Sequence, residues 1–192
     1  MSLLVRALPL TTALACLALS ACGGGTKYRP VSDTPVRIGP SYQVRGERYT
    51  PRAQPDYDML GYAAWYGSES GSQTANGEKF HPAWITAAHR DLPLPTYVEV
   101  TALDTGRRIL VRVNDRGPFA ASSRIIDLSR GAAEELGIRA KGVAAVRVRR
   151  VEPEAKDRER LREGKPARKL PPLDTRALGN LQRQFERGVG AL

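Results

Sequence analysis

The sequence predicts a small closed β-barrel in the middle of the chain. The apolar residues repeat with a period of two in "GYAAWYG" (61–67), "TYVEVT" (96–101), "RRILVRVN" (107–114) and "AAVRVRRV" (144–151). This alternation is typical of short strands with one buried face. Only one helix is expected among these strands, so little else can cover the edges of an open sheet. We therefore expect the sheet to close into a barrel, with a mainly β fold.

The strand and helix signals are local and specific. In the third stretch Ile109, Val111 and Val113 share one face, and Leu110 and Arg112 share the other. The one expected helix lies in "DLSRGAAEELG" (127–137), where Ser129 can cap the start and Gly137 permits a left-handed end. Its apolar stripe consists of Ala132, Ala133 and Leu136.

The flanks of the barrel read differently from its core. Residues 22–58 are rich in Gly, Pro, Ser and Thr and predict a flexible tether that continues as a segment along the domain surface. The barrel domain is expected over 59–151. Residues 152–192 begin with a mixed-charge run and are expected to be largely disordered, with one marginal amphipathic helix near Leu178, Leu181 and Phe185.

The N-terminus has the pattern of an export signal, expected over residues 1–21. Its apolar stretch, 7–19, is shorter than the roughly 20 residues that a membrane-spanning helix needs. The sequence Leu-Ser-Ala-Cys that ends at Cys22 resembles the lipobox of bacterial lipoproteins, in which the Cys receives a lipid; an ordinary secretory signal with an incidental Cys is the alternative. We expect a lipid-anchored protein of the bacterial envelope. Gly23 favours the outer membrane facing the periplasm, with the inner membrane as the alternative.

The charge balance favours an anionic neighbour. The chain has 30 Lys and Arg against 20 Asp and Glu, a formal net charge of +10. On an exported chain this charge points to acidic wall polymer or lipid headgroups rather than nucleic acid, for which no binding motif is present. Once the signal is removed only one of the two cysteines remains, so no disulfide is expected within the fold.

Three stretches carry more polar residues than a barrel requires. In "QTANGEKF" (73–80) Asn76 and Gly77 mark a turn before Glu78, which could equally be a solvated turn residue. In "ITAAHRDLP" (85–93) His89 follows a small apolar run, where a structural histidine is the common case. In "VNDRGPF" (113–119) a strand ends at Asp115, which places this carboxylate on the rim of the barrel.

These residue types leave one kind of chemistry open. His81 and His89 lack the spacing and the third ligand of a zinc site, and no serine lies in a nucleophile-elbow pattern, so neither a metal nor a cofactor is expected. Carboxylate-driven glycoside chemistry or glycan binding remains. An acid at Asp115 must be protonated when substrate is bound, so burial or the charge of Glu78 would have to outweigh the neighbouring Arg116.

The blocks quoted above, together with "RIIDLSRGAAEELGI" (124–138), resemble the rare lipoprotein A family in order and spacing over residues 61–151. The resemblance implies a six-stranded double-psi β-barrel. It also implies an endolytic lytic transglycosylase that cleaves the bond between N-acetylmuramic acid and N-acetylglucosamine in peptidoglycan. Such an enzyme leaves 1,6-anhydro ends, and strands without stem peptides are the expected preference.

The same resemblance implies roles for individual residues. Asp115 would be the acid, and Glu78 and His89 would support it. The residues expected to contact sugar are Arg116, Asn76, Thr74 and Tyr66. The protein is expected to be a monomer with the glycan strand and, through Cys22, a membrane as its partners.

Two alternative functions remain, and the sequence differs from the family in one respect. An expansin-like module could bind the wall without cleaving it, and a structural lipoprotein could merely tether envelope layers. Many relatives carry a C-terminal SPOR domain that binds glycan without stem peptides, whereas the residues after Val151 are too few and too polar to predict one. Septal targeting is therefore not expected.

Overall fold

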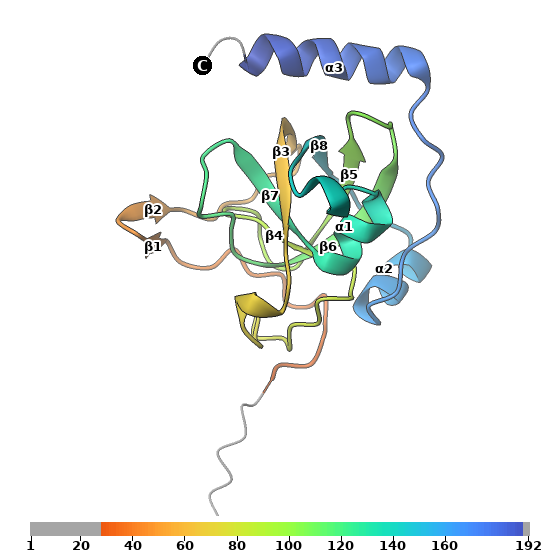
Figure 1. The fold of residues 1–192 in the computed structure, drawn as a ribbon. Coiled ribbons are helices and arrows are strands. Elements are labelled where there is room, and N and C mark those ends of the chain that lie inside the picture. Colours follow the sequence, from red (N-terminus) through yellow and green to blue (C-terminus); the bar gives the residue numbers. More distant parts are fainter. Residues whose placement is uncertain (1–27, 190–192) are drawn as a thin grey trace, which may run out of the picture.

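The computed structural model describes residues 28–189. The expected signal peptide and the lipid attachment at Cys22 lie outside these residues. Six strands form a closed barrel: β3 (Asp58–Tyr66), β4 (Thr86–Ala88), β5 (Thr96–Ala102), β6 (Arg108–Asp115), β7 (Arg124–Ser129) and β8 (Ala144–Arg150) (Figure 1). Around the barrel their order is β3-β7-β4-β6-β5-β8. The pairs β3–β7 and β4–β6 are parallel, and the others are antiparallel. The predicted six-stranded double-psi β-barrel is confirmed.

β-branched residues from neighbouring strands fill the interior of the barrel. Val100 of β5 pairs with Ile109 of β6 on one side and with Val148 of β8 on the other, and all three are buried. Burial of one such side chain contributes about 1.5–3 kcal/mol, so these positions supply much of the stability of the fold. The alternation seen in the sequence therefore reflects a real inward face.

The helix expected inside the barrel domain is α1 (Arg130–Leu136). The Ser129 side chain accepts a hydrogen bond from the Ala132 N–H at 3.1 Å, which caps the start. Gly137 ends the helix with φ of 85° and donates to Ala133 and Glu134. Single turns of 3-10 helix lie at Ser68–Ser70 and Arg139–Lys141.

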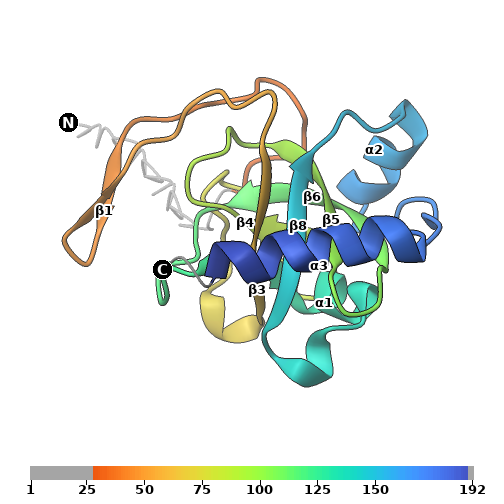
Figure 2. The same ribbon diagram turned by 90° about the horizontal axis from the view of Figure 1, so that it is seen from above.

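From residue 28 the segment before the barrel lies along the domain. This was expected for residues 42–58, whereas residues 28–41, predicted as part of a flexible tether, contact the domain as well. It contains a hairpin of β1 (Tyr42–Val44) and β2 (Glu47–Tyr49), which projects to one side of the barrel (Figures 1 and 2). The rings of Tyr42 and Tyr49 stack at 5.4 Å, and both lie near Phe119. A backbone bridge between Arg37 and Leu94 attaches the same segment to the loop before β5.

The expectation of a largely disordered tail is wrong for its first half. Residues Ala155–Arg162 form α2, whose Leu161 is fully buried in the main hydrophobic core. Asp157 is 3% exposed and accepts a hydrogen bond from the Arg168 N–H at 2.9 Å. The apolar anchor Leu161 and the hydrogen bond to the buried Asp157 carboxylate dock this helix, although its composition is almost entirely charged.

The second half of the tail forms a longer amphipathic helix, α3 (Thr175–Val189). Seen from above, α3 runs across the barrel near β3, β8 and β5 (Figure 2). Phe185 packs edge-on against Tyr62 of β3 at 5.2 Å, and the Gln182 side chain donates to the Leu103 carbonyl. Its apolar residues are only half-buried, so α3 is a peripheral element. Among residues 28–189, no helix has the length and apolar character to cross a membrane.

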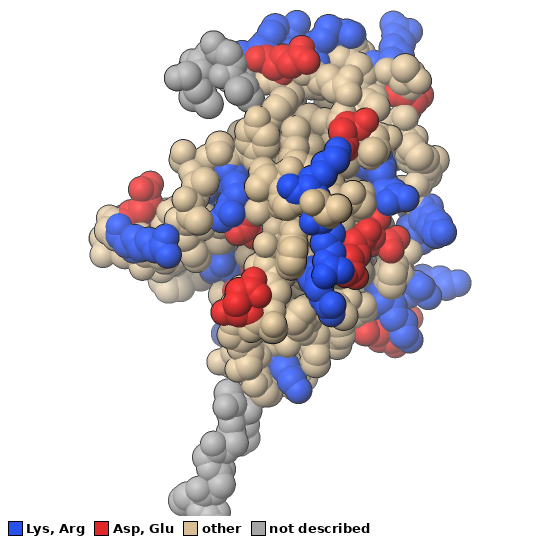
Figure 3. Space-filling model, in the orientation of Figure 1, with Lys and Arg blue, Asp and Glu red and all other residues tan. Residues whose placement is uncertain are grey.

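The excess of basic residues does not form one patch on the face shown in Figure 3, where Lys and Arg lie beside Asp and Glu. Several of these charges are paired, including Arg139 with Glu134 and Lys141 with Asp104. Exposed pairs of this kind contribute about 0–1 kcal/mol each. They therefore serve solubility and spacing of charge more than stability.

The two halves of the tail should differ in their contribution to stability. We expect Leu161→Ala to lower the free energy of unfolding by about 2–5 kcal/mol, because it leaves a cavity in the core. Leu181→Ala on α3 is the matched control and should cost about 1 kcal/mol or less, because that side chain is half-exposed. Urea denaturation of the full chain measures both. Equal losses would contradict the assignment of α2 to the core.

Candidate active site at the ends of β4 and β6

The candidate site lies where β6 ends beside β4. Ala88 of β4 pairs with Asp115 of β6 on one side and with Asp127 of β7 on the other. The next residue, His89, donates its backbone N–H to the Asp115 carbonyl at 3.0 Å. The strand ends thus fix the backbone of Asp115 at the rim of the barrel, as the sequence predicts.

Hydrogen bonds hold the carboxylate of Asp115 through only one of its two oxygens. Oδ1 accepts hydrogen bonds from the backbone N–H groups of Ala75, at 2.7 Å, and Arg116, at 2.8 Å. Oδ2 has no hydrogen-bond partner among the described residues and is not among the buried unpaired atoms, so it reaches solvent. Burial raises the pKa of Asp115 and outweighs the two hydrogen bonds and the charge of Arg116, which lower it.

Arg116 does not form an ion pair with Asp115 within residues 28–189. Its guanidinium donates to the backbone carbonyls of Leu92 (2.5 Å), His89 (3.2 Å) and Ile38 (3.1 Å). It also lies 6.0 Å from the ring of Tyr42. Arg116 therefore ties the loop after β4 to the N-terminal segment. Its predicted contact with sugar stays a prediction.

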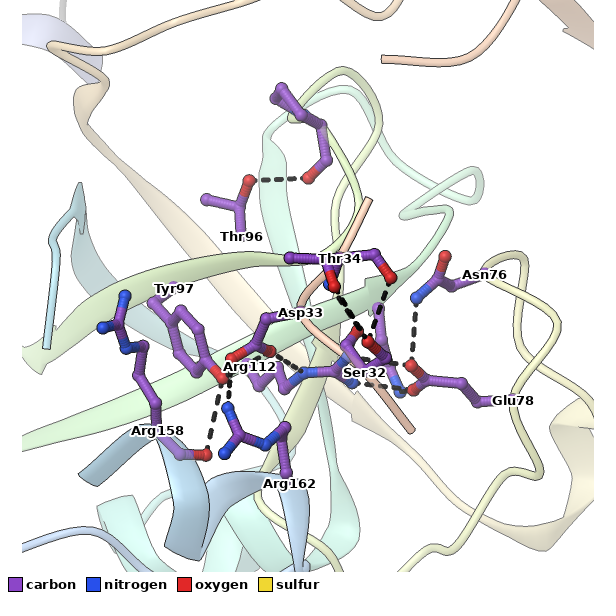
Figure 4. Close-up of polar contacts among 12 residues, drawn as sticks. Ser32, Asp33, Thr34, Asn76, Glu78, Thr96, Tyr97, Arg112, Arg158 and Arg162 are labelled. Atoms are coloured by element: carbon purple, nitrogen blue, oxygen red, sulfur yellow. Dashed lines mark hydrogen bonds and ion pairs between the residues drawn. The ribbon is translucent and has the colours of Figure 1, made fainter. Parts of the chain in front are cut away.

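Glu78 is closed off from solvent rather than placed in a solvated turn. Its carboxylate is 1% exposed and accepts four hydrogen bonds (Figure 4). Arg112 supplies two of them, at 2.7 and 2.8 Å, and the side-chain amides of Asn76 and Asn114 supply the others, at 3.0 and 2.8 Å. Because Arg112 neutralises Glu78, this carboxylate is not a free charge that could raise the pKa of Asp115.

Thr74 and Asn76 also direct their polar groups into the protein. The Thr74 hydroxyl accepts a hydrogen bond from the Glu78 N–H at 3.2 Å, and the Gly77 N–H donates to the Thr74 carbonyl at 2.8 Å. The Asn76 N–H donates to the Asn114 carbonyl at 3.1 Å. These bonds fix loop 74–78 so that the Ala75 N–H points at Asp115. Both residues shape the site, and their predicted contacts with sugar stay a prediction.

His89 is a buried structural residue whose ring does not contact the Asp115 carboxylate. Its Nδ1 accepts from the backbone N–H groups of Asp91 and Leu92, each at 3.1 Å, and Nε2 lies 2.9 Å from the Tyr57 hydroxyl. Because Nδ1 is an acceptor, the proton is on Nε2 and is donated to Tyr57. Burial, with the nearby charges of Arg116 and Arg90, lowers the pKa of His89 to about 3.

Two further oxygen groups lie near Asp115. The Tyr66 ring stacks on Phe80 at 5.1 Å, and its hydroxyl is buried without a hydrogen-bond partner. Burial and the charges of Asp115 and Asp127 raise the pKa of Tyr66 well above its usual value. Asp127 has one buried oxygen without a partner, and burial raises its pKa as well. Tyr66 is thus neutral and borders the candidate acid.

The barrel is similar to a group of known proteins. A family model described as "Lytic transglycolase" matches residues 58–148. Proteins named "Endolytic peptidoglycan transglycosylase RlpA" from Pseudomonas aeruginosa UCBPP-PA14, Neisseria meningitidis serogroup A and Rickettsia bellii are 49%, 45% and 41% identical, over 62%, 59% and 58% of this chain. Over these residues the barrel is similar to the rare lipoprotein A family. The chain spans 35%, 48% and 51% of these three relatives.

Solved structures similar to this domain share less sequence with it. The Streptomyces papain inhibitor is 22% identical with a TM-score of 0.44, over 53% of this chain and all of that chain. An expansin from Clavibacter michiganensis is 17% identical with a TM-score of 0.38, over 52% of each chain.

Sequence reasoning missed three residues of the candidate site: Arg112, Asn114 and Asp127. Arg112 was placed only on the face of its strand opposite Val111 and Val113, and the structure shows that it is 1% exposed and binds Glu78. A signal was available, because Arg112 and Asn114 are two apart on one strand and so share a face. Among the described residues, no group of three or more His, Cys, Asp or Glu side chains is arranged to hold a metal.

The neutral, buried state of His89 can be tested by its titration. Its lowered pKa means that the folded protein resists protonation, so His89 stabilises the fold above pH 6.5, and this contribution is lost as the pH falls from 6.5 toward 3. We expect the NMR spectrum of the full chain to show an Nε2–H tautomer that does not titrate between about pH 5 and 8. His81, which stacks on Trp84 and is more exposed, is the internal control and should titrate. Titration of His89 in that range would contradict the assignment.

Proposed function

We propose that this chain is an endolytic lytic transglycosylase of peptidoglycan. The observation that carries the proposal is the state of Asp115: one oxygen is held by two backbone N–H groups, the other is open, and burial raises the pKa of the carboxyl. Such a carboxyl is suited to donate a proton and to take it back. The names of the relatives favour this activity over wall binding alone.

In the proposed reaction Asp115 acts first as an acid and then as a base. Protonated Oδ2 donates its proton to the oxygen that bridges N-acetylmuramic acid and N-acetylglucosamine, and the bond from C1 of the muramic acid to that oxygen breaks. The 6-hydroxyl of the same sugar then attacks C1, and its proton passes to Asp115. A 1,6-anhydro end forms, no water is consumed and the acid is restored. The Ala75 and Arg116 N–H groups stabilise the carboxylate between the two steps.

The remaining residues of the site act on Asp115 rather than on the glycan. Glu78, Asn76 and Thr74 hold loop 74–78, which supplies the Ala75 N–H to the acid. Tyr66 stays neutral and forms part of the surroundings that raise the pKa of Asp115. A single acid and base differs from the paired carboxylates of most glycoside hydrolases, in which a second carboxylate acts on the sugar or on water.

We further propose that the protein acts at the bacterial envelope as a lipid-anchored monomer. A lipid on Cys22 would tether the barrel to the outer membrane, and the net charge of +10 would favour the acidic wall. Glycan strands without stem peptides are the proposed substrate, as the resemblance to the rare lipoprotein A family implies.

The assigned acid can be tested on isolated glycan strands with and without stem peptides. The full chain should produce anhydromuramoyl ends, detected by mass spectrometry, and Asp115→Asn should lower the rate by about 10²–10⁴-fold, because the proton donor is lost. The thermal midpoint of this variant should not fall, because Asn can still accept both backbone hydrogen bonds and removes a carboxylate that burial disfavours. Asp104→Asn, an exposed aspartate outside the site, is the control. Wild-type protein that binds strands without forming these ends would instead favour the non-catalytic module.

The pH dependence should follow the raised pKa of Asp115. The reaction needs the protonated carboxyl, so kcat/KM is expected to fall as the pH rises through this pKa, which lies above the ordinary value of 3.8. The free energy of unfolding changes with pH in the same direction. The contribution of Asp115 to it is greatest below pH 3.8 and is lost as the pH rises through the raised pKa. Asp115→Asn should remove this part of the slope in urea denaturation. A kcat/KM that rises with pH over the same range would contradict an acid role.

A further inference from the structure

Arg112 lies between two carboxylates that come from distant parts of the chain (Figure 4). On one side it binds Glu78 of the site loop through Nη1 and Nη2, at 2.7 and 2.8 Å. On the other side its Nε–H faces Asp33 at 3.3 Å, and Nη2 also donates to the Ser32 carbonyl at 2.8 Å. The guanidinium is 1% exposed, so its orientation depends on these protein partners and not on water.

Asp33 in turn is anchored by the barrel and by α2. Oδ1 accepts a hydrogen bond from the Tyr97 hydroxyl at 2.8 Å, and Oδ2 accepts one from Arg162 of α2. Burial alone would raise the pKa of Asp33, but the bonds from Tyr97 and Arg162 and the charge of Arg112 lower it, so the carboxylate is ionised. A row of alternating charges therefore runs from Arg162 through Asp33 and Arg112 to Glu78.

The segment that carries Asp33 also contacts the site loop directly. The Arg29 N–H donates to the Gly77 carbonyl at 2.8 Å, and its side chain donates to the Asn76 amide oxygen at 3.2 Å. The loop therefore has the N-terminal segment on one side and β6 on the other. Loop 74–78 contains no large apolar side chain, so these polar contacts hold it in place.

We propose that Asp33 is a positioning residue for Asp115. Asp33 fixes the guanidinium of Arg112, Arg112 fixes Glu78 and its loop, and the loop presents the Ala75 N–H that holds Oδ1 of Asp115. This proposal rests on the proposed function for its effect on catalysis. If so, segment 29–34 and α2 help to position Asp115, although both lie outside the matched residues 58–148.

Physical chemistry gives Asp33 a role that Glu78 alone cannot fill. Without the carboxylate of Asp33 the buried guanidinium of Arg112 loses a negative partner, and an amide at this position turns an NH2 donor toward Arg162 or Arg112, so the guanidinium can relieve this only by moving toward another acceptor. Any such movement shifts Glu78, because two parallel hydrogen bonds tie the groups rigidly. A displacement of the acid by a fraction of an ångström is enough to lower a rate without preventing substrate binding.

The test compares Asp33→Asn with a matched variant, Glu99→Gln, in the full chain. Glu99 is likewise a largely buried carboxylate between two arginines, Arg108 at 3.5 Å and Arg149 at 3.3 Å, but it has no contact with the site loop. Amide hydrogen exchange by mass spectrometry is followed in the peptide that covers 73–80. Rates of anhydro-end formation are measured in parallel, under conditions where far-UV circular dichroism shows each variant to be folded.

We expect Asp33→Asn to speed exchange in the loop and to lower kcat, each on the order of tenfold, with KM changed by less than about twofold. Glu99→Gln should change neither quantity. Arg162→Gln, at a partly exposed position, should act in the same direction as Asp33→Asn but more weakly, and it serves if Asp33→Asn does not fold.

Loop exchange that is unchanged in Asp33→Asn and Arg162→Gln, or equally faster in Glu99→Gln, would overturn the proposal. A lower kcat with an unchanged loop would overturn it too, because the effect would then travel by another route. If the wild-type chain forms no anhydro ends, the proposed function fails, and the exchange measurement alone still decides whether Asp33 holds the loop.

Discussion

The ion pair between Glu78 and Arg112 is the interaction on which the candidate site depends. Both side chains are 1% exposed, so each charge has lost its water and relies on the other. Removing one partner of such a buried pair costs about 3–5 kcal/mol, because the remaining charge is left uncompensated. The side-chain amides of Asn76 and Asn114 donate the other two hydrogen bonds to the Glu78 carboxylate, so no acceptor position remains for substrate. The pair fastens loop 74–78 to β6, three residues before the proposed acid.

This arrangement also explains how Asp115 keeps a raised pKa beside an arginine. A free negative charge at Glu78 would have been one way to disfavour the carboxylate, but Arg112 neutralises that charge. Burial supplies the effect instead, and Arg116 directs its guanidinium to backbone carbonyls away from Asp115. The charge of Arg116 still lowers this pKa, but burial outweighs it, and the Arg116 guanidinium does not form an ion pair with the acid within residues 28–189.

Much of the fold could be predicted from the sequence, because its signals are local. The alternation around Val111 marks an inward face, and Ser129 and Gly137 mark the ends of α1. The site was predicted less well, since a sequence gives residue types but not the direction of side chains. From the sequence Glu78 could be a solvated turn residue, and Arg112 lies on the face of its strand opposite Val111. In the structure the two side chains bind each other across the fold.

The structure of the C-terminal tail was also only partly predictable from the sequence. Its charge content predicts disorder, but Leu161 docks α2 and thereby places Arg162 beside Asp33. A small barrel has a rigid interior, whereas a five-residue loop at its rim buries too little apolar surface to hold itself in place. Charged contacts from segments outside the barrel can supply that order, because they are directional where apolar contacts are not. The exact position of the groups that hold Asp115 is thus expected to depend on residues outside the barrel, which a comparison limited to the barrel would leave out.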